Sequence, residues 1–310
     1  MSGEGDGAML GVAAGDTAGG AWELGYSAVT EQATVVAYQL IEHGRIHIDA
    51  LVKAIRELDG SNEEEPVYRA ESPHFRAWLD RASGGTTTAD EGPSLDGAPR
   101  AVPLGVAFRR QPELLRDEAL TLGKLFYADT ASILAGVVTA GAVAASCFGQ
   151  SGRDLIAGVI EVVDASVGAV GTSPGGGPEA GDLVEELRDL RDHVGVGDGA
   201  EALALAAKGS NPRPWDRVKA GLLLSAPLVE RAHVPIEQAA KIGGSALAAM
   251  VGGVIGARVG IRAWPWAFAN DTWFAEIGRR LVRGPHEVMD LPIPYAVEHH
   301  LISGERQGLH

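Results

Sequence analysis

The amino-acid sequence predicts an all-α fold, and three observations support the prediction. Apolar residues recur at helical spacing in one segment after another, for example at Leu51, Val52, Ile55 and Leu58. Glycine accounts for 42 of the 310 residues and alanine is abundant, so helices can approach one another closely. Strand signals are few, and the extended candidate at residues 291–294 contains two prolines, which a central strand does not tolerate.

The helices are expected from the first residues of the chain onward. A first helix is expected before Asp16, which then precedes the glycine pair Gly19-Gly20. The next helix is expected at residues 30–43, with Thr30 as its N-cap and Glu31 near its positive end. The later helices are expected at residues 49–58, 101–108, 113–122, 130–148, 155–167, 182–193, 200–208, 215–223, 235–257 and 274–282.

Two stretches of the chain, residues 130–152 and 242–257, carry little or no charge. The first is long enough for a membrane helix, whereas the second is short for one. Both are rich in Gly, Ala, Ser and Thr rather than in Leu, Ile and Phe, so we expect two buried core helices. Pro235 suits the first turn of the later helix, where no amide donor is needed.

The domain organisation is expected to be simple. Residues 168–181 are rich in glycine and predict a flexible connector. Residues 83–98 are also rich in glycine, and because they lead directly into Arg100 they are a candidate ligand loop. No boundary divides the chain, so one domain is expected over residues 1–310, with the tail 284–310 lying beyond the last clear helix.

Composition excludes some classes of function. The net charge of −15 argues against nucleic-acid binding, which needs a basic surface, and neither a nucleic acid nor a membrane is expected as a partner. Cys147 is the single cysteine, which fits a reducing cytoplasm, and we expect it to be a small buried residue. The first residues show no basic region before an apolar run, so no signal peptide is expected.

Several short motifs point to one family. Gly15-Asp16, Gly19 and Glu23 form the first, and residues 96–105 and 127–130 form two more. Gly243-Gly244-Ser245 followed by residues 252–257 forms the last. In this order and spacing, the motifs resemble those of the ADP-ribosylglycohydrolase family over roughly residues 9–282. The resemblance implies an all-α fold and hydrolysis of ADP-ribosyl compounds with two magnesium ions.

The chain departs from the family pattern at the positions that would bind metal. Where the family has Thr-Asp-Asp-Thr, this chain has Thr30-Glu31-Gln32-Ala33. Where the family has a late Asp-Thr-Asp-Thr, Ser245-Ala246 follows the glycines, and Tyr127-Ala128 replaces Thr-His. Magnesium needs oxygen ligands anchored by carboxylates, and of these positions only Glu31 carries one. We therefore expect no metal and no other cofactor.

The candidate site residues follow from the resemblance. The predicted catalytic residues are Asp16, Glu23 and Glu31. The predicted ligand-binding residues are Tyr26, Thr30, Gln32, Asp96, Gly97, Ala98, Arg100, Tyr127, Asp129, Gly243, Gly244 and Ser245.

Each candidate has a structural alternative. Asp16 could satisfy the amides of a turn, and Glu23 could lie on the surface of a short helix. Thr30 could only cap its helix, and Arg100 could pair with an acid inside the helical bundle. Gly243 and its neighbours could interrupt or begin a helix, or could simply allow two helices to pack closely.

Two function hypotheses are left open by these residues. In the first, the chain is a hydrolase of the N-glycosidic bond in an ADP-ribosyl, NAD-derived or related nucleotide compound, acting without the two magnesium ions. In the second, it is a non-catalytic relative that binds ADP-ribose, another nucleotide or a protein partner. A purely structural role is the third class. The sequence leaves the oligomeric state open.

Overall fold

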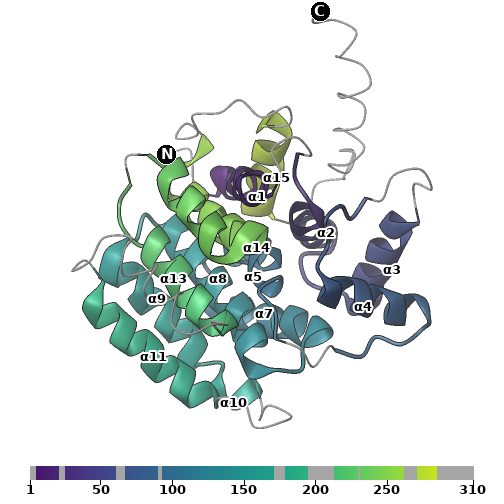
Figure 1. Ribbon diagram of the computed structural model, residues 1–310, viewed down its shortest axis with the longest axis horizontal. Helices are drawn as coiled ribbons and strands as arrows, with labels where there is room; N and C mark the ends of the chain where they lie inside the picture. Colours follow the sequence, from purple (N-terminus) through teal and green to yellow (C-terminus); the bar gives the residue numbers. More distant parts are fainter. Residues whose placement is uncertain are drawn as a thin grey trace, which may run out of the picture.

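The computed structural model describes residues 5–20, 25–60, 67–89, 93–170, 179–194, 213–229, 231–261 and 271–284. These residues form helices and the loops between them, without a β-strand, so the predicted all-α class is confirmed (Figure 1). The helices are α1 (Asp6–Gly19), α2 (Ala28–His43), α3 (Ile48–Asp59), α4 (Pro73–Ser83), α5 (Gly97–Arg100), α6 (Val102–Ala107), α7 (Pro112–Phe126), α8 (Thr130–Cys147), α9 (Gly152–Asp164), α10 (Val167–Val170), α11 (Ala180–His193), α13 (Pro214–Ser225), α14 (His233–Val259) and α15 (Asp271–Arg283).

Three expectations about local structure need correction. Asp16 does not follow the first helix but lies inside α1, which continues to Gly19. The N-cap of α2 is Ser27, whose hydroxyl accepts a hydrogen bond from the Val29 amide at 3.2 Å, and Thr30 lies in the first turn. The connector predicted at residues 168–181 is helical at both ends, in α10 and α11. Residues 171–178, the helix expected at 200–208 and the segment 291–294 lie outside the described residues.

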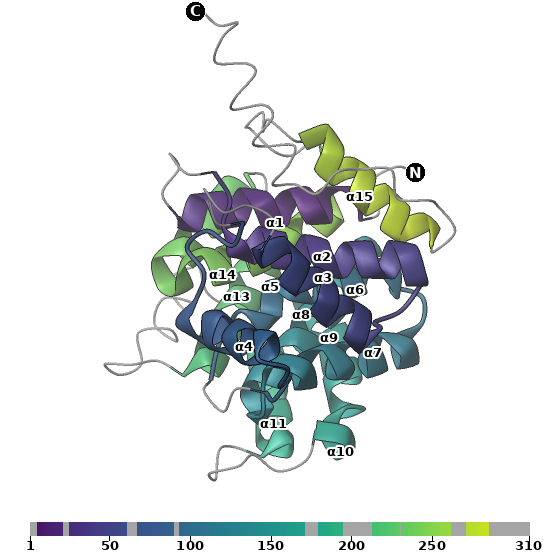
Figure 2. The ribbon, with the colours of Figure 1, turned by 90° about the vertical axis from the view of Figure 1, so that its right-hand side faces the viewer.

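Helix α1 continues past its glycines because it packs against α14 with almost no space between the two backbones (Figure 2). Gly11, Gly15 and Gly19 recur at every fourth position and line one face of α1. A Cβ atom built on Gly11 would lie 2.0 Å from the carbonyl oxygen of Gly252, and one on Gly15 would lie 2.0 Å from that of Ala248. Rising numbers in α1 face falling numbers in α14, so the two helices are antiparallel. Tertiary contact here outweighs the low helix propensity of glycine.

Helix α8 lies in the core, where it contacts α5, α6, α7, α9, α13 and α14. Helices α8 and α14 are both long and apolar enough to cross a membrane, with mean hydropathies of 1.7 and 1.5. The protein itself covers 94% of the α8 window and 61% of the α14 window. As the sequence predicts, α8 is a core helix and Cys147 at its end is buried.

Helix α2 is the element that carries the site, and it is surrounded by other helices. It contacts α1, α3, α5, α6, α14 and α15. Figure 1 shows α2 between α1 and α15 on one side and α3 on the other. Because neighbours surround it, three consecutive residues in its first turn, Thr30, Glu31 and Gln32, are all buried. An amphipathic surface helix would expose at least one of three successive positions.

Candidate functional site

The side chain of Asp16 joins α1 to the start of α2. Its carboxylate accepts hydrogen bonds from the Ser27 amide at 2.7 Å, the Ser27 hydroxyl at 2.7 Å, the Thr30 amide at 3.1 Å and the Thr30 hydroxyl at 2.7 Å. Burial raises the pKa of Asp16, and the hydrogen bonds from Ser27 and Thr30 oppose that shift. The first amides of a helix have no partner within the helix, so Asp16 supplies acceptors that α2 itself lacks.

The main chain of Asp16 reaches the late glycine motif. Its carbonyl oxygen accepts the Gly20 amide at 3.0 Å and the Ser245 hydroxyl at 3.2 Å. The backbone of α14 is not helical at Gly243 or Gly244, and the φ of +63° at Gly244 is one that other residues rarely adopt. Of the alternatives stated for these glycines, the structure shows an interruption, within the helix expected at residues 235–257. The first and last sequence motifs meet at Asp16.

Glu31 is the only predicted catalytic carboxylate besides Asp16 within the described residues, and its side chain is fully buried. Burial first, and then the negative charge of Glu31, raises the pKa of Tyr68 and of Tyr38. Its neighbour Thr30 is bound to Asp16, and Gln32 on the other side is bound to Arg100. Glu31 therefore occupies a position held from both sides. Glu23 lies outside the described residues.

Arg100 lies in a closed polar and aromatic environment. Its guanidinium donates to the Gln32 side-chain oxygen and to the Tyr127 hydroxyl, the latter at 2.9 Å. The guanidinium carbon is 4.0 Å from the centre of the Phe126 ring and 5.2 Å from that of Phe75, which are cation–π distances. With Arg100 only 2% exposed, these contacts describe an internal pairing, although the partners are an amide and a phenol rather than an acid.

The remaining predicted ligand residues border this Arg100 environment. Gly97 and Ala98 are buried in α5, and a Cβ atom on Gly97 would lie 2.9 Å from the Tyr127 ring. A small cavity lined by Gly97, Arg100, Tyr127 and Ser132 has a volume of about 10 Å³. That is close to the room one water molecule needs.

Asp96 and Asp129, the two aspartates of this region, both accept hydrogen bonds from serine residues. Asp96 accepts a hydrogen bond from the Ser72 hydroxyl. Asp129 is the N-cap of α8 and accepts the Ser132 amide at 2.8 Å. Burial raises the pKa of Asp129, and its hydrogen bonds with Ser132 oppose that shift.

Tyr26 lies directly before Ser27, ahead of α2. It is buried edge-on against Phe274 of α15, with ring centres 5.4 Å apart. The structure thus brings Asp16, Thr30 and Ser245 together, and it brings Gln32, Arg100 and Tyr127 together.

Among the described residues, most polar side chains at the family's metal-binding positions are already bonded to other protein groups. The Thr30 hydroxyl donates to Asp16, the Ser245 hydroxyl donates to the Asp16 carbonyl, and the Gln32 oxygen is occupied by Arg100. Glu31 is the one carboxylate at the positions where the family pattern has several, and magnesium sites need carboxylate anchors. Within the described segments, no three His, Cys, Asp or Glu side chains are grouped so that they could hold a metal ion.

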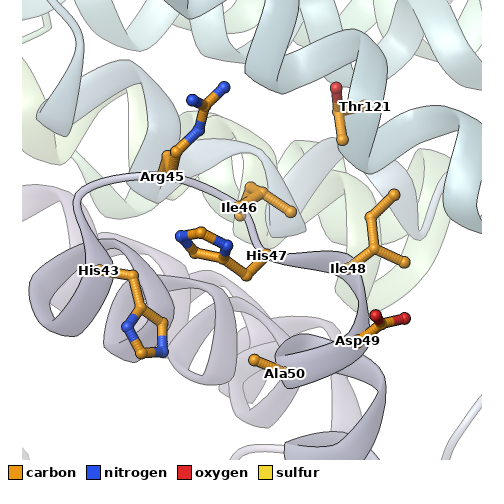
Figure 3. Close-up of a pocket in the computed structure, with 8 residues that line it drawn as sticks. All are labelled: His43, Arg45, Ile46, His47, Ile48, Asp49, Ala50 and Thr121. Atoms are coloured by element: carbon orange, nitrogen blue, oxygen red, sulfur yellow. The ribbon is translucent and has the colours of Figure 1, made fainter.

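An open depression of about 700 Å³ lies elsewhere, at the C-terminal end of α2 (Figure 3). It is lined by His43, Arg45, Ile46, His47, Ile48, Asp49, Ala50 and Thr121. The rise of the helix places it about 20 Å from Thr30. The His43 and His47 rings are 5.1 Å apart, but their nitrogens point in different directions in Figure 3. We therefore locate the candidate site at the start of α2 rather than at this depression.

Comparison with known proteins agrees with the fold and the motifs. The sequence profile of the family described as ADP-ribosylglycohydrolase matches residues 6–289. A solved structure titled "ADP-ribosylglycohydrolase-related protein complex" superposes with a TM-score of 0.63 at 19% sequence identity, covering 91% of this chain and 97% of that one. No curated protein matches the chain. The chain belongs to the ADP-ribosylglycohydrolase family.

Proposed function

We propose that this member of the ADP-ribosylglycohydrolase family is a hydrolase-like enzyme that cleaves the N-glycosidic bond of an ADP-ribosyl, NAD-derived or related nucleotide compound. We further propose that it does so without the two magnesium ions. The observation that carries the proposal is Glu31, a fully buried carboxylate between two anchored neighbours, Thr30 and Gln32. Burying a carboxylate costs free energy, and an apolar residue of similar size would often stabilise the fold better.

Hydrolysis of an N-glycosidic bond is assisted by a carboxylate close to the anomeric carbon. As the bond between the ribose anomeric carbon and the leaving nitrogen breaks, positive charge develops on the sugar, and a nearby carboxylate stabilises it. Water adds to the anomeric carbon and its proton passes to a carboxylate. A leaving arginine nitrogen takes up a proton, whereas a leaving nicotinamide keeps the bonding electron pair on its pyridinium nitrogen and needs no proton. Glu31 would stabilise the charge or accept the proton, and Glu23 is the predicted second carboxylate.

The test is a substitution of Glu31 by Gln, which keeps the shape of the side chain and removes its charge. ADP-ribose released from ADP-ribosyl-arginine and from NAD would be measured by chromatography, with and without EDTA. We expect the rate of Glu31→Gln to fall by roughly 100-fold or more, the usual contribution of a positioned acid or base. We expect EDTA to leave the wild-type rate unchanged.

The matched control is Glu118→Gln. Glu118 is equally buried, accepts the Ile46 amide at 2.7 Å and pairs with Arg45 at 3.2 Å, near the other end of α2. This variant should lose stability and keep its turnover. Equal rates for Glu31→Gln and wild type would exclude the catalytic assignment, and a rate that EDTA removes and Mg²⁺ restores would exclude the metal-free part.

The second candidate is a non-catalytic protein that binds ADP-ribose or a similar nucleotide. The hydroxyls of Thr30 and Ser245 favour it, because both donate hydrogen bonds to Asp16 inside the protein. Calorimetric binding of ADP-ribose without turnover during long incubation would favour this candidate over the enzyme.

A further inference from the structure

Both side-chain oxygens of Asp16 are engaged by other residues of the protein. Oδ2 accepts the Ser27 amide, the Thr30 amide and the Thr30 hydroxyl, and Oδ1 accepts the Ser27 hydroxyl. The sequence motif marked Asp16 as a catalytic candidate, but its contacts are those of a group that holds other residues in place.

The backbone that carries Asp16 is itself fixed. Gly15, directly before it, lies against Ala248 of α14, and Gly19, one turn later, lies against Ser245. The Asp16 carbonyl is bound by the Ser245 hydroxyl at 3.2 Å. The side chain of Asp16 therefore connects the closely packed helices α1 and α14 to the first turn of α2. In that turn Thr30 binds Asp16, and Glu31 is the next residue.

We infer that Asp16 is a positioning residue that sets the place of Glu31 relative to the break in α14, and that it acts through Thr30 and Ser27 rather than on the substrate. The inference rests on the proposed function for the role of Glu31. The hydrogen-bonded junction itself does not depend on that function, so the two can be tested separately.

The junction is tested by hydrogen exchange followed by mass spectrometry. Asp16→Asn places an amide NH₂ against hydroxyl and amide donors, and we expect amide exchange over residues 27–31 to become at least about tenfold faster. Thr30→Val, which keeps the shape and removes the hydroxyl, should give a smaller acceleration in the same segment, and Thr30→Ser should restore protection. Glu118→Gln is the control and should accelerate exchange around Ile46 only.

The positioning role is tested by kinetics with ADP-ribosyl-arginine. If Asp16 acts through Thr30, then Asp16→Asn and Thr30→Val lower kcat while the pH–rate profile keeps its shape, and Thr30→Ser restores the rate. Loss of one limb of the profile in Asp16→Asn, with unchanged exchange at residues 27–31, would overturn the inference and make Asp16 a catalytic residue.

Two further outcomes are also decisive. If wild type shows no turnover, the proposed function fails, and the exchange pattern alone decides whether Asp16 holds the start of α2. If Asp16→Asn does not fold, Thr30→Val and Thr30→Ser carry the test, and unchanged exchange in Thr30→Val would overturn the inference.

Discussion

Asp16 and Asp216 are two buried aspartates whose surroundings differ. Asp16 receives hydrogen bonds only from neutral groups, the amides and hydroxyls of Ser27 and Thr30. Asp216, in the first turn of α13, is bound by Arg213 at 2.9 and 3.0 Å and by Lys219 at 3.1 Å. Burial raises the pKa of Asp16 against its hydrogen bonds, whereas at Asp216 burial is outweighed by the two cations and the pKa is lowered.

The two sets of partners give the two aspartates different roles: Asp216 forms ion pairs, and Asp16 holds two helices together. Around Asp216, two cations balance the charge of the carboxylate, and the ion pair with the half-exposed Arg213 contributes little to stability. Around Asp16, the hydrogen bonds join segments 11 and 14 residues apart in sequence and complete the first turn of α2. Substituting the two aspartates in parallel therefore distinguishes an aspartate paired with cations from an aspartate that joins two helices.

The largest contrast is expected in stability. Asp16→Ala leaves several buried donors without acceptors and should lower the free energy of unfolding by roughly 3–5 kcal/mol. Asp216→Ala should cost about 1 kcal/mol, because Lys219 keeps its ion pair with Glu186. Chemical denaturation monitored by circular dichroism measures both, and equal losses would remove the distinction.

The pH dependence of the two losses should have opposite sign. Because its pKa is raised, folded Asp16 binds its proton more tightly than the unfolded chain does. Its contribution to stability therefore falls as pH rises from 3.8 through the raised value. Because its pKa is lowered, Asp216 contributes above its usual pKa of 3.8 and loses that contribution as pH falls through the lowered value.

Denaturation of Asp16→Asn, Asp216→Asn and wild type over a series of pH values from acid to neutral tests these signs. The gap between wild type and Asp16→Asn should narrow as pH rises, and the gap for Asp216→Asn should widen. Parallel curves for the two variants would contradict the assignment.

The smallest effect is expected at the other end of the junction. Ser245→Ala removes one hydrogen bond to the Asp16 carbonyl, which keeps the Gly20 amide as a donor. The cost should be about 0.5–1 kcal/mol. A larger loss than that of Asp16→Ala would mean that the α14 contact, and not the start of α2, depends most on Asp16.

The helical class and most helices could be predicted from apolar spacing, and the site motifs from the family resemblance. Asp16, Thr30, Gln32, Arg100 and Ser245 were all singled out, and the structure shows that they fall into two hydrogen-bonded groups joined by α2. The pairing partners could not be predicted, because they depend on how helices distant in sequence cross.

Two predictions, the end of α1 and the N-cap of α2, were wrong because contacts with residues distant in sequence determine these helix ends. Glycines after Asp16 predicted a helix end, but contact with α14 keeps α1 helical to Gly19. Thr30 was predicted as the N-cap of α2, whereas the structure has Ser27 there. Both residue types suit an N-cap, so residue type alone does not choose between them. Ser27 was therefore missed as a site residue. The available signal was a serine just before the expected helix start.

The glycine face of α1 also limits how the two helices can be aligned along their axes. Gly11, Gly15 and Gly19 each lie against two successive residues of α14, so a slide by one turn, about 5.4 Å, would separate Asp16 from Ser245. The Ser245 hydroxyl is the feature that distinguishes the correct alignment from the shifted one. A methyl group added at Gly15 should therefore misalign the two ends of the site before it unfolds the protein.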